Sequence, residues 1–319
     1  MVVGERFLRH VPRIAAALAA AAAVLVFSSE SARADSSGAP AYDISWPQCE
    51  SGAPHGDFSF AIIGLNNGRP FTTNDCFAPQ YTWAAQVQVN PAVYINLDFP
   101  RAGRPEADNG PYGRCSETDT WCRGYNWGYA LARDSVNRAI SFGVSPERYW
   151  LDVEMANHWS DVPRDNGQVA RGAIDYFLEH RIPVGIYGTR YQWNLITGGY
   201  TPPNVTLPLW VAGAEDITEA HERCFNRSLA FAGGDTWLVQ YPEGEFDGNV
   251  LCSIAPAIKR PQPAKPAPEV FAVPTTTTAT PERAPEKKVT PWSTRATGTD
   301  TLSRSLGDWV RQAFDGRSP

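Results

Sequence analysis

The 319-residue sequence lacks the short patterns that mark several common classes of enzyme. It has no C-x-x-C pair and no H-E-x-x-H pattern, so a metal site is not expected. No G-x-G-x-x-G follows a candidate strand, which argues against a dinucleotide-binding sheet. The absence of G-x-S-x-G likewise argues against a serine hydrolase of the α/β type. We therefore expect a protein that needs no metal ion and no cofactor.

Long apolar runs are also scarce, and the only one lies near the N-terminus, over residues 14–27. It follows three arginines and precedes Ala32-Arg33-Ala34, which is the arrangement of a secretory signal peptide cleaved after Ala34. The run is shorter than the ~20 residues that a membrane-spanning helix needs, and Ser28 interrupts it. We expect a mature protein without a membrane span, secreted into the medium or held at the cell wall.

The main part of the chain has no excess of positive charge. The whole sequence has a formal net charge of −6, with −12 on residues 35–253 and +4 on residues 254–319. An acidic domain argues against nucleic acid as a partner, because the phosphates of nucleic acids require a basic surface. The basic tail is read either as a solvated linker or as a segment that lies on an anionic cell-wall polymer.

All six cysteines lie beyond the predicted cleavage site. An even number of cysteines in an exported chain predicts disulfides, although the sequence does not fix their connectivity. We take the pairs that are nearest in the sequence, which are Cys49–Cys76, Cys115–Cys122 and Cys224–Cys252.

Composition divides the chain into four parts. Residues 1–34 are the signal peptide, 35–253 the folded domain, 254–295 a linker rich in proline and threonine, and 296–319 a short amphipathic helix. The linker composition buries too little apolar surface to offset the entropy of ordering it. In the last part, apolar residues recur at helical spacing. We expect this helix to dock on the folded domain, on a partner or on a surface.

Strands and helices alternate through the folded domain. Strands are expected over residues 41–45, 58–66, 92–97, 149–154, 182–187, 207–212 and 236–241, with an eighth over 228–231. Helices are expected over residues 78–87, 125–142, 168–180 and 191–197. The alternation predicts an α/β fold, a TIM-like (β/α)8 barrel in a single domain. An open doubly wound sheet is the alternative.

The most specific chemical signal is an acid pair at the end of one predicted strand, Asp152 and Glu154. Residues i and i+2 of a strand face the same side, so both carboxyl groups point into one space. Like charges held close together raise one pKa, which keeps a proton available for general acid catalysis. The alternative is a structural pair held by backbone amides or an arginine.

Two further acids lie at the ends of the first and last predicted strands. Asp43 is in the first strand, and Asp247 is in a loop after the last. First and last strands are neighbours in a closed barrel, so these acids are expected to meet at one rim. Barrel active sites form at the C-terminal rim. An aspartate before glycine, as in Asp247-Gly248, is otherwise a common turn residue.

Aromatic residues gather near the same strand ends. Flat aromatic rings beside carboxylates suit sugars, whose rings have apolar faces and polar edges. Each ring taken alone is equally consistent with ordinary barrel core. The strand aromatics are Tyr187, Trp210, Trp237 and Tyr241, and Trp46 and Trp159 lie in adjoining loops.

These motifs resemble those of the glycoside hydrolase family 25 lysozymes, or muramidases. The resemblance covers the folded domain in order. It includes a D-V-S-x-x-Q-like motif at residues 43–48, D-x-E at 152–154, W-x-x-Q-Y-like residues at 237–241 and G-N-V at 248–250. The sequence departs from the family pattern at Asn67, where an acid is usual, and at Leu251, where an aspartate is usual.

The resemblance implies hydrolysis of the β-1,4 bond between N-acetylmuramic acid and N-acetylglucosamine in peptidoglycan. It implies that Glu154 is the general acid, that Asp152 orients the reacting N-acetyl group or a water, and that Asp43 lines the sugar site. The substrate-binding residues that it implies are Tyr187, Trp210, Gln240, Tyr241 and Asp247. Two other readings are a glycan-binding barrel without turnover, favoured by the two departures, and a tethering protein that acts through its C-terminal helix.

Overall fold

The computed structural model describes residues 39–261. The predicted signal peptide, most of the predicted linker and the predicted C-terminal helix lie outside the described residues.

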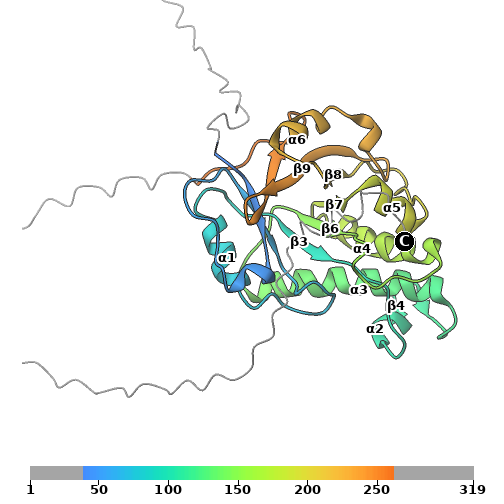
Figure 1. Cartoon of the computed structure of the whole chain (residues 1–319). Coiled ribbons are helices and arrows are strands. Elements are labelled where there is room, and N and C mark those ends of the chain that lie inside the picture. The colour runs from blue at the N-terminus through green and yellow to red at the C-terminus, as the bar shows by residue number, and fades with distance from the viewer. Residues whose placement is uncertain (1–38, 262–319) are drawn as a thin grey trace, which may run out of the picture. The chain divides into compact units, whose positions relative to one another are not determined.

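Eight strands close into a barrel, which confirms the predicted fold class (Figure 1). Their order around the barrel is β1-β10-β9-β8-β7-β6-β3-β2. Every neighbouring pair of barrel strands that does not include β10 is parallel. The strands are β1 (Tyr42–Ile44), β2 (Ala61–Gly64), β3 (Val93–Asn96), β6 (Tyr149–Asp152), β7 (Val184–Gly188), β8 (Pro208–Val211), β9 (Asp235–Glu243) and β10 (Phe246–Leu251).

The eighth strand differs from the prediction. Residues 228–231 do not form a strand, because Arg227–Leu229 is a 3-10 helix. The barrel is closed instead by β10, which follows β9 through a tight hairpin and runs antiparallel to both β9 and β1. Asp247 is therefore a strand residue and not a loop residue. Because β10 is antiparallel, its first residues lie at the C-terminal rim of the other strands.

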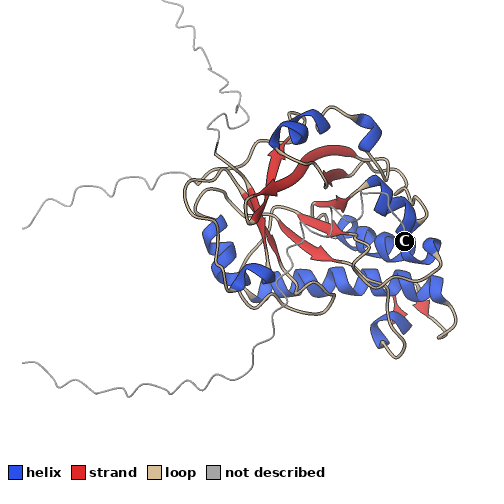
Figure 2. Ribbon diagram, viewed as in Figure 1, coloured by secondary structure: helices blue, strands red, loops and turns tan. Residues whose placement is uncertain are grey.

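Helices cover the outside of the barrel, as Figure 2 shows in blue. All four predicted helices are present, and all four begin earlier than predicted, α3 and α4 by five residues and α1 and α5 by one. Helices α3 and α4 can pack closely because Gly128 has no side chain. A Cβ at this position would lie 1.9 Å from the Val169 carbonyl oxygen. The helices are α1 (Phe77–Ala84), α2 (Pro105–Asp108), α3 (Thr120–Ser141), α4 (Pro163–Glu179), α5 (Arg190–Thr197) and α6 (Ile217–Arg223). No helix between residues 39 and 261 has both the length and the apolar character needed to cross a membrane.

Alternation along the strands produces two apolar layers. Outward residues such as Leu151, Val153 and Ile186 are buried beneath the helices. Inward residues such as Trp150 and Trp210 fill the barrel interior. The inward positions nearer the C-terminal rim are polar, which places the candidate site above an apolar floor.

The three disulfides connect the cysteines as predicted. Cys49–Cys76 and Cys224–Cys252 join residues that are 27 and 28 positions apart in the sequence. The third, Cys115–Cys122, closes a short loop before α3. No cysteine between residues 39 and 261 is free.

Candidate active site

Four carboxyl groups meet at the C-terminal rim of the barrel. Asp43 is in β1, Asp152 ends β6, Glu154 follows two residues later, and Asp247 is at the start of β10. Asp43 and Asp247 are directly opposite each other in the β1–β10 ladder. Electrostatic coupling links Asp43 to both Asp247 and Glu154, and Asp152 to both Asp43 and Glu154. The structure thus brings together the four acids that the sequence singled out.

Asp43 is held by amide side chains from the two closing strands. Gln240 Nε2 donates to its carboxylate oxygens at 3.2 and 3.0 Å, and Asn249 Nδ2 donates at 2.8 Å. Gln240 Oε1 accepts from the Tyr187 hydroxyl at 2.7 Å, and Asn249 Oδ1 accepts from Trp210 Nε1 at 2.7 Å. Each amide thus has its orientation fixed from below, which fixes the carboxylate as well.

Only one of the two carboxylate oxygens of Asp152 has a hydrogen-bond partner among residues 39–261. Its Oδ2 accepts a hydrogen bond from Asn96 Nδ2 at the end of β3. The other oxygen, Oδ1, is buried and has no hydrogen-bond partner within residues 39–261. A buried carboxylate oxygen without a donor is costly unless a ligand completes it. Asn96 is itself oriented by Asn66, whose side-chain amide pairs with the backbone of Asn96 at 3.1 and 3.2 Å.

The pKa values of all four rim acids are raised. Burial and the neighbouring carboxylates raise the pKa of Asp43 and of Asp152 well above its ordinary value. Burial raises the pKa of Asp247 to about 6. Negative charges on neighbouring carboxyl groups repel one another, which favours the protonated forms.

Glu154 combines a raised pKa with access to solvent. Burial, reinforced by the charge of Asp247, raises its pKa to about 7, and the Tyr187 hydroxyl partly offsets this. Its side chain is half-buried, whereas Asp43 and Asp152 are buried. Trp159 Nε1 donates to the Glu154 carbonyl at 2.7 Å, which fixes the backbone at this position. Glu154 is therefore the rim acid best suited to exchange a proton with a ligand.

An aromatic floor, made by Tyr94, Trp150, Tyr187 and Trp210, lies beneath the acids. Trp210 is its centre, with ring centroids 4.5 Å from Tyr187, 5.9 Å from Trp150 and 6.0 Å from Tyr94. Gly64 makes room for Tyr94, because a Cβ there would lie 2.8 Å from the tyrosine ring. The floor excludes water beneath the carboxyl groups and so contributes to their raised pKa values.

Three predicted aromatic positions need correction. Trp210 is only 1% exposed, so it supports the site from below and offers no ring face to a sugar. Tyr241 faces the outside of the barrel, where its ring packs over Gly248. Trp237 lies at the opposite end, beneath the guanidinium of Arg148, which directly precedes β6. The predicted aromatics that reach the rim are Tyr187, whose ring is part of the floor while its hydroxyl bonds Gln240, the exposed Trp46 and the half-buried Trp159.

The sequence interpretation missed the asparagines that orient the acids. Asn96 ends β3, Asn66 lies two residues beyond the end of the neighbouring β2, and both are buried. Buried asparagines at strand ends were a usable signal, because a buried amide needs partners. Tyr94, which lies at half depth in β3, was also missed.

A separate pocket of about 360 Å³ lies beside the rim. Its lining includes Thr189, Tyr191, Ala212 and Arg223, and it contains none of the four acids. It lies against the outer side of β8, since Val211 also lines it and belongs to the outer layer. It is therefore distinct from the carboxyl site.

The geometry can be compared with known proteins. A family model described as "Lysozyme-like protein 1" matches residues 122–240, which include Asp152, Glu154 and Gln240. A curated relative from Dictyostelium discoideum, named "Probable GH family 25 lysozyme 4", is 29% identical over 110 residues. Over these segments the chain is similar to lysozymes of family 25. The alignment covers 34% of this chain and 48% of that relative, so the chain spans about half the length of the curated family 25 protein that it matches.

Solved structures of lysozymes and muramidases also resemble the chain. A muramidase from Trichobolus zukalii has 18% identity and a TM-score of 0.40, over 67% of this chain and 93% of that one. A bacterial lysozyme from Streptomyces coelicolor has 19% identity and a TM-score of 0.39, over 68% and 93%. The barrel itself is established by its own strand order.

The two departures from the family 25 pattern lie in different places. Leu251 ends β10 opposite Leu238, at the far end of the strand from Asp247. The acid of β10 that faces the site is therefore Asp247. Asn67 follows β2 near the rim, where its backbone N–H donates to Thr72 Oγ1 at 3.0 Å.

Proposed function

We propose that the protein is a secreted glycoside hydrolase that cleaves the β-1,4 bond between N-acetylmuramic acid and N-acetylglucosamine in peptidoglycan. The observation that carries the proposal is the pairing of Glu154, a half-buried acid with a pKa of about 7, with the buried carboxyl of Asp152. Glycosidases use two carboxyl groups beside the scissile bond, one of which must be protonated. The relationship to family 25 lysozymes supports this substrate.

Glu154 is proposed to donate its proton to the leaving glycosidic oxygen as the bond to the anomeric carbon breaks. Asp152 Oδ1, which is buried without a partner within residues 39–261, is placed to accept a hydrogen bond from the N–H of an N-acetyl group or from a water. Asp43, held by Gln240 and Asn249, would line the sugar site with Asp247 and Tyr187. The water that replaces the leaving sugar returns a proton to Glu154.

An extracellular location is part of the proposal. The signal-like N-terminus supports it, and so do three disulfides, which persist in oxidising compartments. We propose residues 35–253 as the hydrolase domain, with the segments 254–295 and 296–319 as a linker and a docking helix.

The test is the release of soluble fragments from purified peptidoglycan by the mature protein. Release under conditions where a heat-inactivated sample releases nothing would support hydrolysis. Binding to the wall without release, unchanged in Glu154→Gln, would favour the alternative of a glycan-binding barrel.

The pH dependence of the reaction follows from the raised pKa of Glu154. A general acid acts while protonated, so kcat/KM should be high below pH 7 and fall as the pH rises through about 7. Asp247→Asn removes a negative charge that raises this pKa, and the fall should then begin at lower pH. A rate that keeps rising from pH 6 to pH 9 in the parent protein would contradict Glu154 as the acid.

A further inference from the structure

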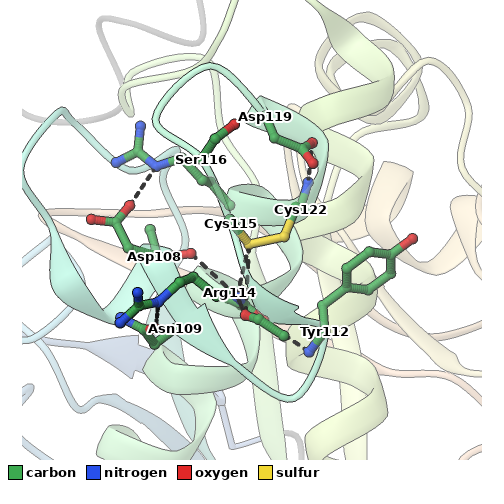
Figure 3. Close-up of a disulfide and its surroundings, with 12 residues drawn as sticks. Asp108, Asn109, Tyr112, Arg114, Cys115, Ser116, Asp119 and Cys122 are labelled. Atoms are coloured by element: carbon green, nitrogen blue, oxygen red, sulfur yellow. Dashed lines mark hydrogen bonds and ion pairs between the residues drawn. A yellow bond between two sulfur atoms is a disulfide. The ribbon is translucent and has the colours of Figure 1, made fainter.

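A disulfide-closed insertion lies at the rim between β3 and α3. It spans residues 100–119 and contains α2 and the hairpin of β4 (Asn109–Gly110) and β5 (Gly113–Arg114). Figure 3 shows the Cys115–Cys122 disulfide joining the end of this hairpin to the first turn of α3. In the same view, Asp119 caps α3 by accepting from the Cys122 backbone N–H at 3.1 Å. The insertion is therefore covalently anchored to a long helix.

Two buried side chains from α3 hold the backbone of the insertion. Arg123 is 4% exposed, donates to Asp108 at 2.9 Å and donates to the Arg101 carbonyl at 3.1 Å. Asn126 is fully buried, and its amide donates to the Gly113 carbonyl at 2.9 Å and accepts from the backbone N–H of Tyr112 at 3.0 Å. Residues on the insertion are thus presented in fixed positions.

The insertion contributes to an arginine patch, which we define as Arg69, Arg101 and Arg104. Burial raises the pKa of the Asp98 carboxyl to about 6. Each of the three arginines is close enough to Asp98 to lower this pKa in part. Arg104 is stacked 4.8 Å from the ring of Trp127 and 5.4 Å from that of Phe71.

The charge of the arginine patch is largely unpaired. Asp98 makes no ion pair within 4.0 Å to any described residue, and its carboxylate accepts instead from Trp127 Nε1 at 3.1 Å. The exposed guanidinium groups of Arg69 and Arg101 have neither an ion pair nor a hydrogen bond to any residue in the range 39–261. Arg104 has only a weak contact with Glu106 at 3.4 Å.

The arginine patch lies in the same sector of the rim as the catalytic acids. Asp98 is two residues beyond Asn96, which binds the Asp152 carboxylate. The next residue, Phe99, donates its N–H to the carbonyl of His158 at 2.7 Å, in the loop that follows Glu154. Burial and, to a smaller extent, the charge of Arg101 lower the pKa of His158, so the Arg101 guanidinium lies near that loop.

We propose that the arginine patch is a subsite for an anionic substituent of the glycan, a carboxylate or a phosphate, on a sugar next to the bond cleaved at Glu154. The inference rests on the proposed function, because it assigns part of the same substrate. Guanidinium groups match the two oxygens of such anions, and they are most effective where they are already fixed. Within a domain of net charge −12, the patch would also draw a negatively charged glycan towards acids that otherwise repel it.

The test measures binding, so that it does not depend on turnover. The double variant Arg69→Ala/Arg101→Ala is made in a Glu154→Gln background, and its Kd for soluble peptidoglycan fragments is measured by calorimetry. The fragments are used as isolated, after amidation of their carboxylates, and after removal of their phosphates. The matched control is Arg114→Ala, which removes an exposed arginine from the same insertion and has only a 3.4 Å contact with Asn109.

We expect the double variant to weaken binding of untreated fragments about tenfold, and Arg114→Ala to change it less than twofold. Loss of the arginine dependence after amidation would identify a carboxylate, and loss after phosphate removal would identify a phosphate. Equal Kd values for the double variant and its background, or an equal loss on untreated and fully neutralised fragments, would overturn the subsite. If the parent cleaves no glycan while arginine-dependent binding persists, the hydrolase proposal fails and the subsite remains.

Discussion

Replacing Glu154 with glutamine is expected to reduce the rate of glycan cleavage roughly 10²- to 10⁴-fold, the range for loss of a general acid. Glutamine keeps the size of the side chain and removes the proton that the leaving oxygen needs. Binding should change much less, because the half-buried side chain still fills its place at the rim. Initial rates of reducing-sugar formation from purified cell wall, measured beside Kd, separate the two effects.

The matched control for this change is Glu215→Gln. Glu215 is an exposed acid after β8, and its side chain makes no hydrogen bond or ion pair to a described residue. It should retain the parental rate. Equal rates for the parent and for Glu154→Gln would mean that another acid protonates the leaving group, with Asp247 the first to test because burial raises its pKa to about 6.

Replacing Trp210 with alanine is expected to reduce the free energy of unfolding by about 3–5 kcal/mol. The ring is 1% exposed and packs against three other aromatic side chains of the floor. Its removal leaves a cavity and also leaves Asn249 Oδ1 without its donor. Urea unfolding followed by circular dichroism measures the change.

Trp210→Phe separates packing from hydrogen bonding. It keeps most of the ring volume but removes the indole N–H, so a loss of about 1–3 kcal/mol is expected from the unsatisfied Asn249. Trp46→Ala, at a ring that is 46% exposed, should change stability by about 0.5 kcal/mol or less. A Trp210→Ala protein as stable as the parent would show that the floor does not hold the site.

The pairing of Asp152 with Glu154 was predictable because strand alternation is local. An apolar run that ends in two acids two residues apart places both on one face, whatever the rest of the chain does. The meeting of Asp43 with Asp247 was also predictable, since closing a barrel makes the first and last strands neighbours. The first inference needed only local alternation, and the second needed only the order of the strands.

The final strand was not predictable in the same way. The residues of β10 include Asp247, Gly248 and Asn249, which are types disfavoured in strands, so the segment reads as a loop. Its conformation is imposed by pairing on both sides, with β9 and with β1. Tertiary pairing has here overridden local preference.

The aromatic positions show a second limit. Gln240 and Tyr241 are adjacent, so they point to opposite faces of β9, and only the inward one reaches the acids. Trp210 does face inward, but alternation says nothing of depth along the strand, and this ring lies in the floor. The arginine patch was beyond prediction, because it gathers side chains from two loops that are separated by strand β3.

The identity of the reducing sugar that the protein leaves on digested peptidoglycan tests the central claim most directly. Fragments released by the parent and by Glu154→Gln would be reduced with borohydride, hydrolysed and analysed by mass spectrometry. The account predicts new N-acetylmuramic acid ends with the parent and none with the variant. New N-acetylglucosamine ends would contradict the assigned bond, and release of peptides without any new reducing end would contradict glycoside hydrolysis altogether.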